Sequence, residues 1–163
     1  MKEVARRRGT SLSDNAITRL RDNVLRLPAH SDVEPALRAL RDAGFTTAAL
    51  PNNPLPVVRE QLHRASLDLL FAEIMSIDEA GALKPAPEVY RFAAGRLSLP
   101  PASIWMVAAH GWDIAGATRA GMRGAFVARP GQSPDPFALP EIIADDLLSL
   151  AQAILATKHV SQK

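Results

Sequence analysis

Three short polar stretches hold the residues of this sequence that are best suited to chemistry. Lys84 precedes a stiff segment with two prolines, which fixes where its ammonium group points. Asp113 comes three residues after His110, and Asn52 lies in a turn between two prolines. Together they offer an ammonium group, a carboxylate and an amide for a binding or catalytic site.

Each of these residues also has a purely structural interpretation. Asn52 suits a tight turn, because Asn tolerates left-handed conformations. Asp113 suits the N-cap of a helix equally well, and Lys84 could be an exposed loop lysine, although the chain has only four lysines against fifteen arginines. The only tyrosine, Tyr90, suits a ring packed in the core with its hydroxyl at the surface. No second histidine or cysteine accompanies His110 at metal-ligand spacing, so we expect no zinc site.

Composition and motifs exclude several classes of protein. The 163 residues contain no cysteine, which excludes disulfides, thiol nucleophiles and thiolate metal sites and favours the cytoplasm. A net charge of +2 is too small to indicate a nucleic-acid partner. The longest apolar run, 104–109, is far shorter than the ~20 residues of a membrane span, so we expect no membrane partner. Glycine-rich nucleotide loops and the Gly-x-Ser-x-Gly hydrolase motif are also absent from the sequence.

Apolar periodicity predicts the elements that position these residues. The pattern alternates helices and short apolar strands, which indicates an α/β fold with a doubly wound parallel sheet. We expect helices over 13–27, 32–44, 55–65, 87–97, 113–120 and 146–156, with Asp32 as the N-cap of the second. We expect strands over 45–50, 72–75, 104–108, 124–128 and 142–143. Ligands of such sheets bind beyond the carboxyl ends of the strands, where 51–53, 76–84 and 109–113 are found.

Three motifs, taken in order, resemble the later motifs of the haloacid dehalogenase superfamily. They are LPNN at 50–53, the segment from Asp78 that ends in KPAPEVY at 84–90, and VAAHGWDIAGA at 107–117. The similarity is closest to the 2-haloacid dehalogenases of type II and runs from about residue 13 to the end of the chain. It implies a haloacid dehalogenase-like core of Rossmann-like topology, with part of a helical cap at the N-terminus.

The resemblance implies a reaction and a set of site residues. In this hydrolase family an early Asp-x-Asp aspartate attacks a 2-haloacid, and water hydrolyses the resulting ester to a 2-hydroxy acid. Lys84 matches the lysine that stabilises this carboxylate, and Asp113 the acid that positions the hydrolytic water. The implied substrate-binding residues are Asn52, Tyr90, His110 and Trp112. The resemblance implies a small-molecule 2-haloacid as partner, no metal and no cofactor, and it leaves a homo-oligomer open.

The sequence also departs from the family pattern. No Asp-x-Asp motif occurs ahead of residue 45, so the nucleophile and its strand are not among these residues. In the superfamily that strand lies between the strands ending here at Leu50 and Ala108. Pro51 and Ala108 stand where the family has hydroxyl side chains, and Ala109 stands where superfamily phosphatases have a magnesium ligand. We therefore expect residues 1–30 to be a remnant of the cap and 31–163 a core that lacks its first strand.

These departures leave two interpretations of function open. One is a truncated 2-haloacid dehalogenase that is inactive alone, because Lys84 and Asp113 have no ester to act on. The other is a non-catalytic binding or structural relative, in which the sheet pairs again or a partner chain supplies the strand. A superfamily phosphatase is a weaker third possibility. Whether the chain is itself an enzyme is undecided by the sequence.

Overall fold

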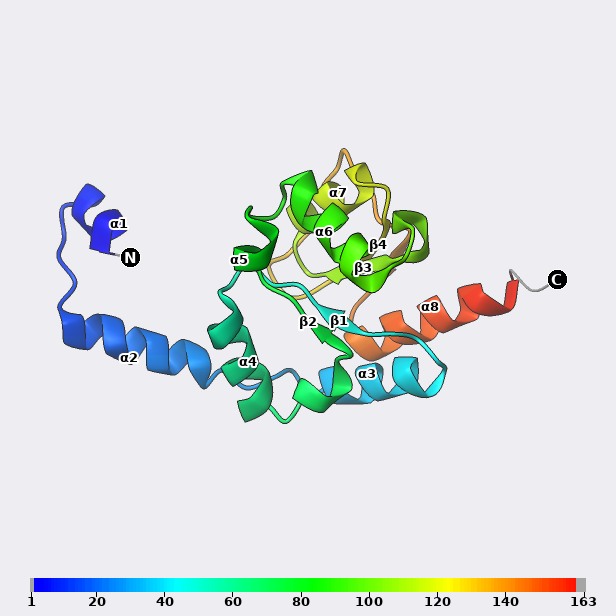
Figure 1. Ribbon diagram of the computed structural model, residues 1–163, viewed down its shortest axis with the longest axis horizontal. Coiled ribbons are helices and arrows are strands. Elements are labelled where there is room, and N and C mark those ends of the chain that lie inside the picture. Colours follow the sequence, from blue (N-terminus) through cyan, green and yellow to red (C-terminus); the bar gives the residue numbers. More distant parts are fainter. Residues whose placement is uncertain (1, 161–163) are drawn as a thin grey trace.

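The protein folds as a set of short parallel strands covered by helices (Figure 1). The computed structural model describes the backbone of residues 2–160 and the side chains of residues 3–157. Its α-helices are α1 (Lys2–Arg7), α2 (Asp14–Leu25), α3 (Val33–Asp42), α4 (Leu55–Arg64), α5 (Ile77–Ala80), α6 (Pro87–Leu97), α7 (Gly111–Arg119) and α8 (Leu147–Val160). Two single 3-10 turns are η1 (Asp68–Leu70) and η2 (Pro101–Ser103). None of the helices described is both long and apolar enough to cross a membrane.

The strands form two parallel sheets instead of one. Strands β1 (Ala48–Ala49) and β2 (Glu73–Ile74) pair with each other. Strands β3 (Trp105–Ala108), β4 (Arg123–Val127) and β5 (Ile142–Ala144) form the second sheet in that order. Within residues 2–160, β1 and β3 are edge strands that do not pair with each other. The two sheets therefore stay apart at the position where the family resemblance implies a further strand.

Helices cover both faces of the strands, as a doubly wound fold requires. On one face, α6 and α7 bury Tyr90 and Ala117 against Met106 of β3 and Leu50 beside β1. On the other face, α3 and α8 pack together, and Leu150 of α8 lies in the cluster that includes Val107. Side chains alternate between these faces along β3, as expected for a strand buried on both sides. The predicted α/β architecture is thus confirmed.

Most expected elements are present, but their ends differ. The predicted helices at 55–65 and 87–97 match α4 and α6 closely, whereas the predicted strand 45–50 shortens to two residues. Ser13 caps α2 as its type suggests, with its hydroxyl accepting from the Ala16 N–H at 3.1 Å. Helix α6 has a proline in its first turn, where a missing N–H costs no hydrogen bond.

Two expected caps are wrong, and tertiary contacts explain both. Asp32 stands before α3 but makes no cap to it; its carboxylate instead accepts from the Leu147 N–H at the start of α8, at 2.6 Å. The N-cap position of α7 belongs to His110, and Asp113 is the third residue of the helix. Each carboxylate accepts from a charged donor elsewhere in the fold, Arg129 for Asp32 and Lys84 for Asp113. A charged donor binds a carboxylate more strongly than a neutral N–H does.

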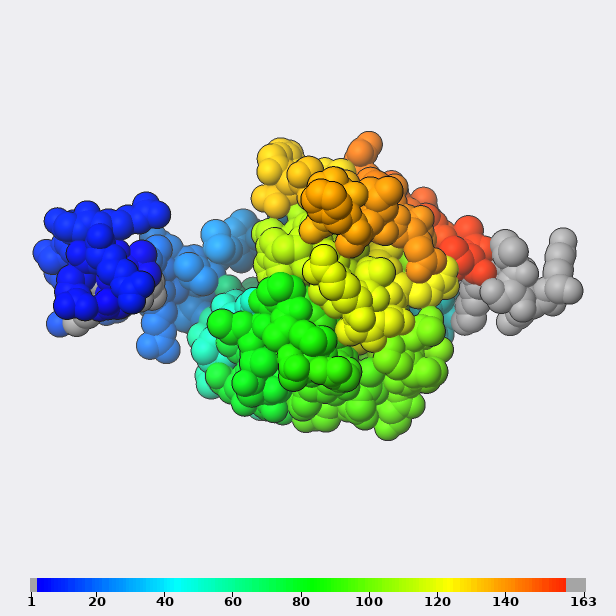
Figure 2. All heavy atoms as spheres, turned by 90° about the horizontal axis from the view of Figure 1, so that it is seen from above, coloured from blue at the N-terminus to red at the C-terminus, as the bar shows by residue number. Residues whose placement is uncertain are grey.

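The N-terminal helices project from the rest of the molecule. Figures 1 and 2 show α1 and α2 at one end of the chain, extending away from the sheets. Helix α2 has no buried residue, and the Gln61 side chain of α4 donates a hydrogen bond to its Val24 carbonyl at 3.0 Å. Few contacts therefore hold this arm.

Candidate active site

The carboxyl ends of β1, β2 and β3 meet through side chains of the loops that follow them. Asn52 follows β1, Lys84 comes after β2 and α5, and Asp113 lies in the first turn of α7 after β3. Lys84 contacts both of the others: its backbone bonds to the Asn52 side chain and its ammonium to Asp113. Because three strand ends converge there, these strands point in the same direction, and the site occupies the edge predicted for a ligand.

Lys84 and Asp113 form a buried ion pair. The Lys84 Nζ atom donates to Asp113 Oδ2 at 2.6 Å, and each side chain is only 6% exposed. Tyr90 Oη donates to the other carboxylate oxygen, Oδ1, at 2.8 Å. The Lys84–Asp113 pair is thus fixed on both sides of the carboxylate, which is the condition under which a buried charge is tolerated.

Tyr90 contributes more than packing. Its side chain is fully buried, so the expectation of a hydroxyl at the surface is wrong. Burial, with the hydrogen bond to Asp113 adding to it, raises the pKa of the Tyr90 hydroxyl far above its ordinary value. Tyr90 therefore stays protonated and acts as a fixed donor to the carboxylate.

The close packing of this cluster depends on a small residue in α7. A Cβ atom built on Gly116 would lie 2.6 Å from Tyr90 Oη and 2.8 Å from Pro85 Cβ. Helix α7 can therefore approach Tyr90 and the loop of Lys84 only because residue 116 has no side chain. That approach places the Asp113 carboxylate, one turn earlier in α7, within reach of both partners.

Asn52 holds the Lys84 backbone instead of pointing freely into the site. Its Oδ1 accepts from the Lys84 N–H at 2.8 Å, and its Nδ2 donates to the Lys84 carbonyl at 3.1 Å. This two-way contact joins residues 32 positions apart and links the loop after β1 to the lysine. The geometry indicates that Asn52 positions Lys84. Neither a simple turn residue nor a free amide donor would make this pair of hydrogen bonds.

His110 and Trp112 lie beside the cluster but outside its hydrogen bonds. Their ring centroids lie 5.5 Å apart with the ring planes tilted by 40°, and Trp112 is 42% exposed. They flank Gly111, where an added Cβ atom would lie 2.4 Å from the backbone nitrogen of Asp135. The structure thus brings Lys84, Asp113, Tyr90 and Asn52 together and leaves these two aromatic residues at the surface.

A groove of about 570 Å³ opens next to the ion pair; we call it the central groove. It is bordered by residues 45–51 around β1 and by residues 103–109 around β3, and Lys84 and Asp113 both line it. Its wall is mainly apolar, with side chains that include Leu37, Leu40, Val58, Val107 and Ile154. The central groove therefore lies between the two edge strands and ends at the polar site.

The sequence interpretation missed Arg129, which also lines the central groove. Arg129 follows β4, and its guanidinium donates to both carboxylate oxygens of Asp32 at 2.8 and 2.9 Å. Burial opposes ionisation of Asp32, but the hydrogen bonds from Arg129 and the Leu147 N–H outweigh it and hold its pKa below the ordinary value. The strand predicted at 124–128 also ends at this edge of the sheet. Its following loop, taken together with 51–53, 76–84 and 109–113, would have pointed to Arg129.

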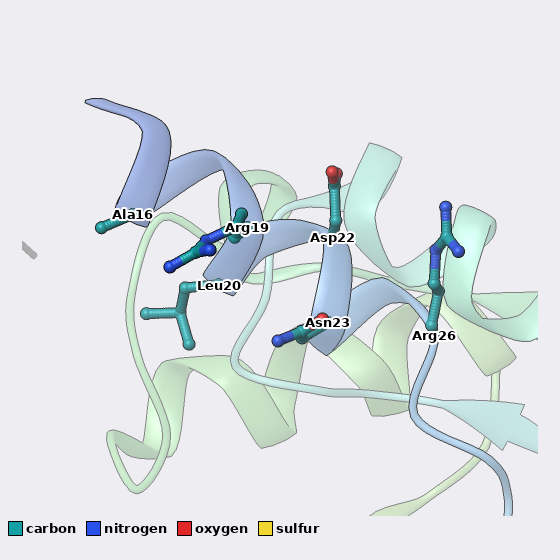
Figure 3. Close-up of a pocket in the computed structure, with 6 residues that line it drawn as sticks. All are labelled: Ala16, Arg19, Leu20, Asp22, Asn23 and Arg26. Carbon is teal, nitrogen blue, oxygen red and sulfur yellow. The ribbon is translucent and has the colours of Figure 1, made fainter. Parts of the chain in front are cut away.

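A second hollow, of about 520 Å³, runs along α2 (Figure 3). Its lining residues are Ala16, Arg19, Leu20, Asp22, Asn23 and Arg26, all from that helix. It is separate from the ion pair, since neither Lys84 nor Asp113 lines it. Among the described side chains, no group of three or more His, Asp or Glu residues is arranged to hold a metal ion.

Comparisons with known proteins agree on one family. The family model of the haloacid dehalogenase-like hydrolases matches residues 3–121. The chain is 39% identical over 99 residues to (S)-2-haloacid dehalogenase 1 of Pseudomonas sp. strain CBS-3, covering 61% of this chain and 44% of that protein. It is 31% identical over 134 residues to haloacetate dehalogenase H-2 of Moraxella sp. strain B, covering 78% of this chain and 59% of the relative.

A solved structure of an L-2-haloacid dehalogenase superposes with a TM-score of 0.85 at 28% identity. The superposition covers 92% of this chain and 66% of that structure. The chain therefore spans about half the length of the two curated relatives and two thirds of the solved structure.

Proposed function

Because the chain belongs to the haloacid dehalogenase-like hydrolase family, we propose that its Lys84–Asp113 pair serves the hydrolytic dehalogenation of a 2-haloacid. The observation that carries this proposal is the buried pair at the point where the carboxyl ends of β1, β2 and β3 converge. Both curated relatives carry dehalogenase names. We propose residues 31–163 as the core of this hydrolase and residues 1–30 as part of a helical cap.

The proposed reaction has two displacement steps. A carboxylate oxygen attacks the carbon that bears the halogen, a carbon–oxygen bond forms, and the halide leaves with the bonding electrons. Water then attacks the carbonyl carbon of the ester, which releases the 2-hydroxy acid, one proton and the regenerated carboxylate. No redox partner is required for either step.

Lys84 suits the first step because its ammonium group has unused donors. An ammonium group has three N–H donors, and one acceptor, Asp113 Oδ2, accompanies it among the described residues. The remaining donors adjoin the central groove, which Lys84 lines. We propose that they hold the attacking carboxylate ionised and in place, because a nearby cation favours the charged form.

Asp113 suits the second step as a fixed, dry carboxylate. Tyr90 and Lys84 each donate to one of its oxygens, so its plane is set before any ligand arrives. Each carboxylate oxygen can accept more than one hydrogen bond. We propose that Asp113 accepts a hydrogen bond from the hydrolytic water, that Tyr90 and Asn52 position the pair, and that His110 and Trp112 contact substrate from the surface.

The attacking carboxylate has no candidate within this cluster except Asp113 itself. No other acidic side chain lines the central groove among the described residues. We therefore expect the 163-residue chain alone to release no halide from a 2-haloacid.

An added carboxylate tests this proposal on the chain as it exists. Chloride release from each enantiomer of 2-chloropropionate is measured by ion chromatography, with and without excess formate. We expect formate to raise chloride release above the protein-free background, since it can enter beside Lys84 and act as nucleophile. The variants Lys84→Met and Asp113→Asn should each lose at least about tenfold of that release, the usual contribution of a positioned charge or base.

Glu60→Gln, on the exposed face of α4, serves as the matched control and should keep the release unchanged. Formate-dependent release that is equal in all four proteins would contradict the proposed roles. Release without formate that persists in Asp113→Asn would contradict the mechanism, because a different group would then be the nucleophile.

A further inference from the structure

The two donors that hold the Asp113 carboxylate come from different segments of the chain. Lys84 lies in the loop that follows α5, and Tyr90 lies near the start of α6. The chain between them is short and contains Pro85 and Pro87, which stiffen it. Helices α5 and α6 lie against each other (Figure 1). The position of Lys84 relative to Tyr90 therefore depends on how α5 is held against α6.

One side chain of α6, that of Arg96, ties this helix to the segment that precedes Lys84. Its guanidinium donates to the Glu73 carboxylate of β2 at 2.9 Å and to Glu79 Oε1 of α5 at 3.0 Å. The same guanidinium lies over the ring of Phe92, one turn earlier in α6, at 5.9 Å from the ring centroid. Arg96 therefore joins the consecutive elements β2, α5 and α6 at a single point.

Glu79 passes this contact to the buried backbone at the start of α5. Its second oxygen, Oε2, accepts from the Ser76 N–H at 3.1 Å, in the capping box that begins the helix. Ser76 is fully buried, and α5 ends at Gly81, whose left-handed conformation leads into the loop of Lys84. A helix of four residues has little stability of its own, so α5 depends on contacts such as the one to Arg96.

We propose that Arg96 is a positioning residue for the Lys84–Asp113 pair and acts through α5. Without its guanidinium, α5 and the loop after it open away from α6 more often, and Lys84 is held less firmly beside Asp113. A contact at the surface thereby controls the geometry of a buried pair. That the pair serves dehalogenation rests on the proposed function, whereas the coupling to Arg96 does not.

The exposure of the Arg96 network makes this coupling sensitive to salt. The exposed fractions of the side chains are 43% for Arg96, 37% for Glu73 and 31% for Glu79. Solvent ions screen attractions between charges that are exposed to this extent, whereas the buried Lys84–Asp113 pair is screened much less. High salt should therefore imitate the loss of the Arg96 guanidinium.

Amide exchange of the whole chain, followed by NMR, tests the coupling without a substrate. The reporter is the Lys84 N–H, which donates to Asn52 Oδ1 at 2.8 Å. The reference is the Ala128 N–H beyond β4, which donates to the Ala144 carbonyl at 2.8 Å. We expect Arg96→Met to speed exchange at Lys84 about fivefold, the usual value of two partly exposed ion pairs, and to leave Ala128 unchanged.

Two matched variants separate positioning from a general loss of charge. Arg96→Lys keeps the charge but lacks the planar fork that binds two carboxylates at once, so it should recover part of the protection at Lys84. Arg91 lies on the same helix in an exposed ion pair with Glu88 at 3.0 Å. Arg91→Met should therefore exchange at Lys84 as the parent chain does.

Tyr90 provides a second measurement on the other side of the carboxylate. It is the only tyrosine, so tyrosine isotopically labelled at Cζ gives one resonance, which responds to the hydrogen bond from its hydroxyl to Asp113. We expect this resonance to move in Arg96→Met and to stay in place in Arg91→Met. Salt at about 1 M should speed Lys84 exchange in the parent chain and add little in Arg96→Met.

The outcomes distinguish the coupling from its alternatives. Equally faster exchange at Lys84 and Ala128 in Arg96→Met would show an effect on global stability alone and would overturn the proposal. An unchanged Lys84 amide or an unchanged Tyr90 resonance in that variant would overturn it as well. Neither measurement needs a substrate, so a failed formate experiment would leave the coupling standing, and a failure here would leave the proposed reaction standing.

Discussion

Two ion pairs border the central groove, and they differ in burial and in what holds their carboxylates. In the Lys84–Asp113 pair, both side chains are 6% exposed, and the carboxylate accepts from Lys84 Nζ and Tyr90 Oη. In the Arg129–Asp32 pair, the carboxylate accepts two bonds from Arg129 and one from the Leu147 N–H. The first pair is dry, whereas the carboxylate of the second is held by contacts that tie α3, β4 and α8 together.

The difference shows that similar charges near one edge of a sheet can have different roles. A carboxylate that accepts charge-assisted bonds from another segment holds the fold together. A buried pair stabilises less than its charges suggest, because desolvation opposes the attraction between them. The two pairs should therefore respond differently when one partner is removed.

The largest effect is expected for Lys84→Met. Removing the cation leaves the Asp113 carboxylate buried without a counter-charge, which costs about 3–5 kcal/mol of unfolding free energy. Urea denaturation measures this loss. The double variant Lys84→Met, Asp113→Leu should recover most of it, because the uncompensated charge is gone. A single variant within about 1 kcal/mol of the parent would contradict a dry site.

A smaller effect is expected for Asp32→Asn. The side chain keeps its shape but loses charge-assisted bonds to Arg129 and the Leu147 N–H, and the unfolding free energy should fall by about 1–3 kcal/mol. Denaturant titrations at neutral pH measure it. An unchanged stability would show that the pair does not join α3 to α8.

The pH dependence of this difference has a fixed sign. The folded-state pKa of Asp32 is lowered from its ordinary value of 3.8, so the carboxylate stabilises the fold fully above that value. The contribution disappears as the pH falls through the lower folded-state pKa. The stability gap between the parent and Asp32→Asn should therefore be constant near neutrality and close below about pH 4.

The smallest effect is expected for Glu34→Gln, in an ion pair with Arg38 on the exposed face of α3. Both side chains are about half exposed, at 56% and 51%, so solvent screens their attraction. We expect a loss of about 0.3–0.5 kcal/mol in the same titrations, smaller still in high salt. A loss as large as that of Asp32→Asn would show that burial and the number of hydrogen bonds do not set the difference between the two pairs.

Local patterns predicted much of this fold. The helices at 55–65 and 87–97 were found because apolar spacing and prolines at helix starts act within a few residues. The length of the strand at 48–49 was overestimated as 45–50, because strand length depends on a pairing partner that the neighbouring residues do not specify. The caps expected of Asp32 and Asp113 failed for a related reason: partners from distant segments compete for the same carboxylates.

Motif spacing and periodicity are local properties of the chain, so they were enough to predict the family, the alternation of strands and helices, and the residue types of the site. Which of those residues meet was settled by the fold. It joined Asn52, Lys84, Tyr90 and Asp113, left His110 and Trp112 at the surface, and brought Arg129 to Asp32. It also kept β1 and β3 apart around the central groove. Contacts between segments dozens of residues apart depend on how all elements pack, and no local pattern encodes that.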